Sequence, residues 1–256
     1  MASISLQQGI IYGPVLSRRF GRSFGINLLP ASHKVCSFDC RYCEYGKTLD
    51  KTMHPLENIL PAKDLILEEV EYALKKPRTI ETLTFSGNGE PTLHPEFLGI
   101  VRGVKKLRDV YRPETKIALL SNSSCLDQPE VVEAIQLIDL PMMKLDAGDE
   151  TTFRQINQPA IGITFEAILS GLASLSGLMI QTMLIDGEIT NSRGQPFESL
   201  VQALIRLSPD KIQLYSLERP TVDEKLIPVS PFRLQQIEAQ MQNQFSLNAE
   251  AFWRDQ

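Results

Sequence analysis

The sequence predicts an α/β fold in which parallel strands form a partial (β/α)6 barrel, and two observations support this prediction. Short apolar segments rich in Ile, Leu, Thr or Phe alternate with longer amphipathic segments along the chain. Six such β–α pairs follow one another, which favours an open barrel over a closed barrel of eight units. The 256 residues can bury one large core, so we expect a single domain spanning 1–256.

The predicted elements are placed by apolar patterning and by helix-start signals. Proline or a capping residue marks several helix starts, including Thr164 and the pair Ser230-Pro231. The predicted strands are 24–30, 80–86, 116–121, 142–147, 178–186 and 211–217. The predicted helices are 62–76, 95–110, 129–138, 164–175, 196–207 and 231–243. The six units thus occupy 24–243, between an N-terminal basic extension at 1–23 and a C-terminal tail at 244–256.

Composition and cysteine usage indicate a cytoplasmic protein. Apolar residues make up 43% of the chain, no apolar run is long enough to span a bilayer, and the first residues do not resemble a signal peptide. Of the four cysteines, three fall within eight residues, which is typical of a metal site rather than of a disulfide framework. We therefore expect a reducing compartment and no membrane partner.

The charge is distributed unevenly along the chain. The net charge is −5, yet residues 1–51 have a local balance of +4. A basic segment on an acidic body can bind one anionic group, but it is a poor footprint for extended nucleic acid. We expect Arg18, Arg19 and Arg22 to lie across the strand ends and hold an anion of the substrate or the cofactor, with a solvated basic loop as the alternative.

The cysteine segment carries the main chemical signal. Cys36, Cys40 and Cys43 stand in a C-x3-C-x2-C pattern, which can hold three irons of a cubane cluster and leave the fourth iron open. A structural zinc site needs four closed ligands, and His33 or His54 could supply the fourth. An iron–sulfur site and a zinc site both remain open on spacing alone.

This motif, with Tyr42 directly before the last cysteine, resembles that of the radical S-adenosylmethionine (radical SAM) superfamily. The resemblance implies a radical SAM core with the partial TIM-like barrel and a [4Fe–4S] cluster held by Cys36, Cys40 and Cys43. The open iron would bind S-adenosylmethionine, which is cleaved reductively to a 5′-deoxyadenosyl radical. It also implies an electron donor such as flavodoxin or ferredoxin, and cofactor contacts from Phe38 and Tyr42.

The resemblance extends over most of the chain. The segment 87–91 looks like the family's glycine-rich G-G-E-P element with one residue inserted, and glycines there let the backbone approach the methionine end of the ligand. Further implied contacts lie at the end of the third predicted strand and in the region of the fourth, where the ribose and the methionine carboxylate are held. The implied cofactor-binding residues are Gly87, Asn88, Gly89, Glu90, Pro91, Ser121, Asn122, Asp146 and Arg154, and for Arg154 a surface salt bridge is the alternative.

The opening segment 12–27 is similar to a subgroup related to the wyosine-type tRNA base-modifying enzymes. The resemblance implies an enzyme that abstracts hydrogen from an unidentified substrate, either a small molecule or a nucleotide-like one, and the basic segment favours an anionic substrate. Two alternatives are kept. One is a tRNA base-modifying radical SAM enzyme, and the other is a non-enzymatic zinc or iron–sulfur binding module.

Strand alternation predicts which side chains line the interior. Lys144 and Asp146 share a face because strand side chains have a period of two, and Gln213 and Tyr215 share a face in the same way. We expect Lys144 and Tyr215 to be catalytic, with Gln181 and Gln213 beside them in a polar substrate cavity. A mutual Lys144–Asp146 ion pair is the alternative. The fourth cysteine, Cys125, is either a substrate-facing thiol or an inert buried residue.

Overall fold

The computed structural model describes residues 4–219, 221 and 223–253, and it groups the chain into two compact units. The first unit comprises Ser5–Ser37 and Thr48–Pro141. The second comprises Met1–Ile4, Phe38–Lys47 and Met142–Gln256. The unit boundaries therefore fall within the cysteine segment, with Cys36 in the first unit and the other two cysteines of the motif in the second.

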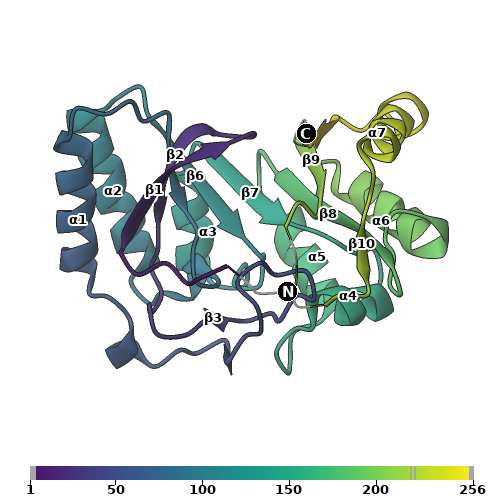
Figure 1. The fold of residues 1–256 in the computed structure, drawn as a ribbon, viewed down its shortest axis with the longest axis horizontal. Coiled ribbons are helices and arrows are strands. Elements are labelled where there is room, and N and C mark those ends of the chain that lie inside the picture. The colour runs from purple at the N-terminus through teal and green to yellow at the C-terminus, as the bar shows by residue number, and fades with distance from the viewer. Residues whose placement is uncertain (1–3, 220, 222, 254–256) are drawn as a thin grey trace. The chain divides into compact units, whose positions relative to one another are not determined.

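The first unit is a mostly parallel sheet with three helices (Figure 1). Its strands run in the order β1, β2, β5, β6, where only the β1–β2 pair is antiparallel. Each strand after β1 is followed by a helix, which is the expected β–α alternation. The elements are β1 (Ile11–Ser17), β2 (Gly21–Ile26), α1 (Lys63–Lys75), β5 (Thr82–Phe85), α2 (Phe97–Tyr111), β6 (Lys116–Ser121) and α3 (Pro129–Gln136).

Short elements of the first unit shape the carboxyl edge of this sheet. Two-residue strands β3 (Val35–Cys36) and β4 (Asp50–Lys51) pair in parallel, and β3 also bridges to Gly89. The 3-10 helices are η1 (Glu57–Ile59) and η2 (Pro91–Leu93). Strand β3 thus places Cys36 beside the turn that follows β5.

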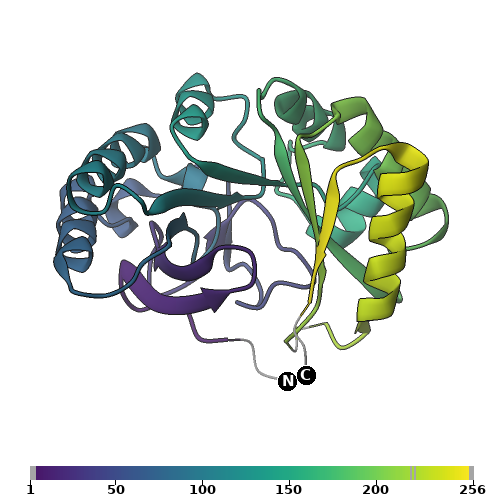
Figure 2. The same ribbon diagram turned by 90° about the horizontal axis from the view of Figure 1, so that it is seen from above.

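The second unit continues the same alternation. Strands β7, β8, β9 and β11 pair in parallel in that order, and β10 pairs antiparallel with the end of β8. Helix α7 lies alongside β11 (Figure 2). The elements are β7 (Leu140–Lys144, which begins at the unit boundary), α4 (Glu150–Asn157), α5 (Phe165–Ala173), β8 (Met179–Gly187), α6 (Gly194–Leu207), β9 (Lys211–Ser216), β10 (Leu226–Pro228), α7 (Pro231–Phe245) and β11 (Ala249–Phe252).

The predicted helix starts hold in the second unit. Thr164 caps α5 by accepting a hydrogen bond from the Ala167 amide, and Ser230 caps α7 by accepting one from the Arg233 amide. Each of these bonds satisfies an amide that the helix itself leaves without a partner. All six predicted strands and all six predicted helices are present, and all except β6 have a shift at one end or both.

Several elements of the described residues had no counterpart in the prediction, namely helix α4, strands β1, β3, β4, β10 and β11, and the 3-10 helices η1 and η2. Helix α4 is short and mostly polar, with only Phe153 and Ile156 as large apolar residues at helical spacing. Strand β1 is half-exposed and contains Gly13-Pro14, residues that usually mark loops. The residues Asn27–Pro30, expected to end the first strand, instead form a loop after β2.

Candidate active site

The glycine-rich turn after β5 is shaped by the close approach of strand β3. Gly87 and Gly89 have φ angles of +131° and +149°, which only glycine adopts readily. A Cβ on Gly89 would lie 1.6 Å from the carbonyl oxygen of Val35. Gly89 is therefore required by the packing of the segment that carries Cys36, in addition to any role in binding a ligand.

Glu90 is buried and joins two loops of the first unit. Its Oε1 accepts hydrogen bonds from the Thr92 amide (3.1 Å) and hydroxyl (2.7 Å), and its Oε2 accepts one from the Asn122 amide at 2.6 Å. Burial raises the pKa of Glu90 against these hydrogen bonds, which favour the charged form. The carboxylate therefore ties the turn after β5 to the end of β6, and its expected contact with the ligand's ammonium stays a prediction.

Asn88, the inserted residue of the turn, faces the protein interior. Its amide nitrogen donates to the carbonyls of Gln7 (2.9 Å) and Pro30 (2.8 Å), and its side-chain oxygen accepts from the Gln7 amide. Its backbone amide donates to Asn27 Oδ1 at 3.0 Å. Asn88 thus connects the opening segment of the chain to the glycine-rich turn.

Asn122, at the carboxyl end of β6, lies next to the first cysteine. Its amide nitrogen is 2.7 Å from Ser37 Oγ and 3.6 Å from Cys36 Sγ, and its side-chain oxygen accepts from the Ser124 amide. Ser121, the last residue of β6, is buried and accepts a hydrogen bond from the Ser123 amide. The first unit therefore gathers Cys36, the glycine-rich turn and Asn122, as the sequence predicts.

In the second unit, the cysteine segment is held against the end of α4. The Asp39 amide donates to the Asn157 carbonyl at 3.1 Å, and the Arg41 amide donates to the Ile156 carbonyl at 3.0 Å. Phe38 is buried and packs edge-on against the ring of Phe153, 5.4 Å between centroids. Backbone bonds on both sides of Cys40 therefore define its position relative to α4.

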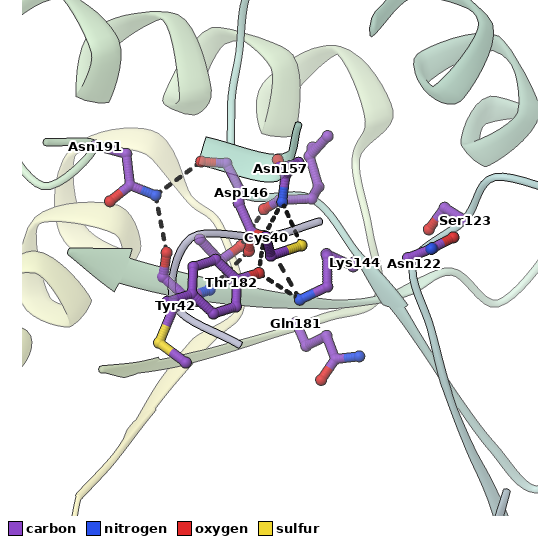
Figure 3. A network of polar contacts seen from close by, with 12 residues as sticks. Cys40, Tyr42, Asn122, Ser123, Lys144, Asp146, Asn157, Gln181, Thr182 and Asn191 are labelled. Atoms are coloured by element: carbon purple, nitrogen blue, oxygen red, sulfur yellow. Dashed lines mark hydrogen bonds and ion pairs between the residues drawn. The ribbon is translucent and has the colours of Figure 1, made fainter. Parts of the chain in front are cut away.

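Asp146, just after β7, is the centre of a buried polar network (Figure 3). Its Oδ2 accepts from the Tyr42 hydroxyl and from Asn157 Nδ2 (2.8 Å), and its Oδ1 accepts from the Met183 amide (2.9 Å). Asn191 donates to its carbonyl oxygen at 2.7 Å. Asp146 is thus held by contacts from four separate segments of the chain.

Lys144 completes this network with a charge. Its Nζ lies 3.5 Å from Asp146 Oδ2 and donates to the Tyr42 hydroxyl at 2.5 Å. Burial alone would lower the pKa of Lys144, but the charge of Asp146 outweighs it and raises the pKa above the ordinary value. The mutual ion pair is therefore present, and it keeps an ammonium group beside the cysteine segment.

The polar residues expected on the inner face of the strands lie in one row. Parallel pairing sets Lys144, Gln181 and Gln213 side by side across β7, β8 and β9. Tyr215 is two residues further along β9 and its hydroxyl is 3.5 Å from Gln181 Oε1. These side chains share a face of the sheet, and their role in binding substrate stays a prediction.

A cavity of about 300 Å³ opens at the cysteine segment of the second unit. It is lined by Asp39, Cys40, Arg41, Lys47, Gln158 and Asp223. The Tyr42 ring lies in the neighbouring apolar cluster with Ile156, Met183, Ile185 and Leu226, and Cys40 packs against this cluster. Cys40 therefore has an apolar support on one side and a solvent-accessible cavity on the other.

Arg154 is not brought into the Asp146 network by any contact between described residues. Its side chain is 51% exposed and pairs with Glu150 one helical turn earlier, at 2.5 Å. An ion pair of this exposure contributes little to stability. The surface salt bridge is thus formed, and the expected carboxylate contact stays a prediction.

The expected position of the basic segment is wrong. Arg18 and Arg19 lie in the turn between β1 and β2, at the amino end of β2, and the Arg22 backbone amide donates to Glu81 there. The carboxyl end of β2 leads into Asn27 and the glycine-rich turn, about 17 Å away along a six-residue strand. An antiparallel hairpin, absent from the prediction, directs the arginines to the opposite end of the sheet.

Cys125 is buried, as the alternative of an inert residue requires, and its role stays a prediction. It is 1% exposed, and burial raises the pKa of its thiol to about 12. Its sulfur lies 3.7 Å from Ser124 Oγ. A thiol with this pKa is a poor nucleophile at neutral pH.

The sequence offered no signal for the roles of Asn157, Asn191 or Asn27. Asn157 and Asn191 lie outside any motif, and Asn27 ends the opening segment 12–27 without a predicted role; each makes its contact with a residue from another segment of the chain. Asn157 in particular donates to Cys40 Sγ at 3.4 Å. Only the tertiary structure brings these amides to the site.

The sequence predicts no membrane-spanning segment for the described part of the chain. No helix there combines the length and apolarity that crossing a membrane requires. No three His, Cys, Asp or Glu side chains of the described residues are gathered as a metal site in the structure.

Fold and site together define an α/β protein with parallel strands and a three-cysteine segment whose first cysteine lies beside a glycine-rich turn. The family model of the radical SAM superfamily matches residues 32–205, well over half of the chain. The chain belongs to the radical SAM superfamily. Enzymes of this superfamily use a [4Fe–4S] cluster, S-adenosylmethionine and a reductant, so the predicted cofactors are confirmed at the level of the family.

Similar curated proteins are longer than this chain. It is 35% identical over 228 residues to the UPF0026 protein MJ1312 of Methanocaldococcus jannaschii, covering 86% of this chain and 67% of that protein. It is 30% identical over 220 residues to a protein named GTPase Obg from Brachyspira hyodysenteriae, covering 84% of this chain but only 31% of that protein. The chain thus spans about two thirds and about one third of these two relatives.

Solved structures confirm the predicted fold class. A radical SAM methyltransferase from Sphaerobacter thermophilus superposes with a TM-score of 0.63 at 17% identity, over 91% of this chain and 67% of that one. TYW1 with a lysine-pyruvate adduct bound superposes with a TM-score of 0.56 at 17% identity, over 86% and 73%. At this identity the likeness shows the shared α/β partial barrel.

Proposed function

We propose that this chain cleaves S-adenosylmethionine reductively at a [4Fe–4S] cluster held by Cys36, Cys40 and Cys43. The observation that carries the proposal is the C-x3-C-x2-C segment, which lies inside the residues matched to the superfamily. All four cysteines of the chain are free thiols, the form that ligates iron. The donor set fits the cluster, since three thiolates leave one iron without a protein ligand.

The cluster would supply the electron that produces a 5′-deoxyadenosyl radical from bound S-adenosylmethionine. The chain's own residues bind and shield that cofactor. The backbone from Gly87 to Pro91 would bind its methionine end. Hydrogen bonds from Thr92 and Asn122 fix the position of the Glu90 carboxylate in this turn. Free thiols and an oxygen-labile cluster also support a cytoplasmic location.

Other contacts to the cofactor are proposed from both units. In the first unit, Ser121 and Asn122 end β6 next to Cys36 and present hydroxyl and amide groups. In the second, Asp146 presents a carboxylate suited to the ribose hydroxyls, and Phe38 and Tyr42 support the cysteine segment. Arg154 would have to leave Glu150 to reach the methionine carboxylate.

The proposed substrate is an anionic molecule, either small or nucleotide-like, that gives up a hydrogen atom. Support for the anionic class comes from the ammonium of Lys144 and from Lys47 at the cavity, where Arg41 is already paired with Asp223 and Glu188. Lys144 and Tyr215 would contact the substrate from the inner face of the sheet. A protein donor of the flavodoxin or ferredoxin type would supply the electron.

Metal analysis after anaerobic purification and reconstitution tests the proposal. We expect about four irons per chain and 5′-deoxyadenosine on addition of S-adenosylmethionine and dithionite. Cys36→Ala, Cys40→Ala and Cys43→Ala should each abolish both, because three ligands leave no redundancy. Cys125→Ala is the matched control and should retain both. Stoichiometric zinc, or a Cys36→Ala variant that still forms product, would refute the proposal.

A further inference from the structure

Asn157 makes two hydrogen bonds through one amide nitrogen. It is the last residue of α4 and is 1% exposed. Its Nδ2 lies 3.4 Å from Cys40 Sγ and 2.8 Å from Asp146 Oδ2 (Figure 3). A primary amide has two hydrogens, so this geometry gives one to the sulfur and one to the carboxylate.

The contact with sulfur is held from several directions. The Asn157 carbonyl accepts from the Asp39 amide, and the neighbouring Ile156 carbonyl accepts from the Arg41 amide, so the backbone on both sides of Cys40 is paired with the end of α4. On the other side, Asp146 is itself positioned by the Met183 amide at 2.9 Å. The backbone contacts of α4 and the fixed Asp146 carboxylate thus direct the Asn157 side-chain amide at the Cys40 sulfur.

A donor directed at a cluster thiolate changes the energy of electron uptake. The N–H dipole withdraws negative charge from the sulfur, and the reduced cluster carries one more negative charge than the oxidised one. Hydrogen bonds to cysteine sulfurs are among the factors that set iron–sulfur potentials, and burial strengthens them. A donor at Cys40 therefore stabilises the reduced state more than the oxidised state.

We infer that Asn157 is a positioning residue that raises the reduction potential of the cluster through its hydrogen bond to Cys40. The inference rests on the proposed ligation by Cys36, Cys40 and Cys43. Asn157 would thereby make it easier for the cluster to accept the electron that cleaves S-adenosylmethionine.

The midpoint potential of the reconstituted protein tests this inference. Asn157→Leu keeps the branching and the number of heavy atoms of the side chain and removes both donated hydrogens. We expect the ratio of reduced to oxidised cluster at a given potential to fall about tenfold, which is a shift of about 59 mV for one electron. A redox titration followed by electron paramagnetic resonance measures the shift, and iron analysis confirms loading.

Thr182→Val is the matched control in the same unit. It removes a buried hydroxyl that donates to the Leu145 carbonyl at 2.8 Å. The control should lose some stability and keep the wild-type potential. If Asn157→Leu fails to fold, Asn157→Ala takes its place in the titration.

The outcomes separate this inference from the proposed function. A lower potential in a fully loaded Asn157 variant, with the control unchanged, supports the inference. An unchanged potential in that variant overturns it while leaving the cluster assignment intact. A wild-type protein that binds no iron overturns the proposed function, and the inference with it.

Discussion

Gly89→Ala is expected to displace strand β3 and with it Cys36. The added Cβ would lie 1.6 Å from the Val35 carbonyl oxygen, far inside van der Waals contact, so the two segments must separate. Separation breaks two hydrogen bonds, from the Val35 amide to the Asn88 carbonyl (3.1 Å) and from the Glu90 amide to the Val35 carbonyl (3.2 Å). The variant should therefore lose stability and fail to load the cluster.

The size of this loss follows from two contributions. A non-glycine residue at a φ of +149° costs about 1–3 kcal/mol. The two hydrogen bonds contribute about 0.5–1.5 kcal/mol each. The free energy of unfolding of Gly89→Ala, measured by urea titration, should then fall by roughly 2–6 kcal/mol.

Gly162→Ala provides a matched control for the steric part of the argument. Gly162 also has a positive φ, +93°, but a Cβ there would meet no heavy atom within 4 Å. It should lose only the conformational contribution, about 1–3 kcal/mol, and should bind iron normally. Equal losses of stability and equal iron contents in the two variants would refute the role assigned to Gly89.

Two further predictions concern charged groups of the first unit. Replacing Arg18 and Arg19 by Gln should leave iron content and 5′-deoxyadenosine formation unchanged, since both lie at the amino end of β2; a drop in product would show that the turn serves the cofactor after all. Burial tends to raise the pKa of Asp139, but the Ile117 amide and Arg108 lower it below the ordinary aspartate value of about 3.9. The ionised carboxylate therefore stabilises the fold at pH values above about 3.9. This stabilisation is lost as the pH falls through the lowered pKa. The difference in unfolding free energy between wild type and Asp139→Asn should therefore narrow below about pH 4, and a constant difference would contradict this assignment.

The order of strands and helices could be predicted because it depends on local apolar patterning. Short segments rich in apolar residues, such as Lys116–Ser121 and Lys211–Ser216, are mostly buried parallel strands, as expected. Helix α4 was missed because its burial depends on neighbours distant in sequence, as the contact of Phe153 with Phe38 illustrates. The apolar pattern of the sequence therefore predicts the repeating β–α units better than the short polar elements between them.

Only the site residues that belong to a sequence motif could be predicted. The cysteine spacing and the Gly87–Pro91 turn indicate the chemistry directly. Asn157 and Asn191 carry no such mark, because their roles arise from tertiary contacts with Cys40 and Asp146. The β1–β2 hairpin, which the apolar pattern does not predict, also places the basic segment at the opposite end of the sheet from the one expected.

Electron paramagnetic resonance of the reduced protein with and without S-adenosylmethionine tests the central claim most directly. If Cys36, Cys40 and Cys43 hold a [4Fe–4S] cluster with one iron open to the cofactor, adding S-adenosylmethionine should change the spectrum of the reduced cluster. The Cys125→Ala variant should behave in the same way, because this buried thiol lies outside the proposed set of ligands. A spectrum that stays the same at saturating S-adenosylmethionine would contradict the account.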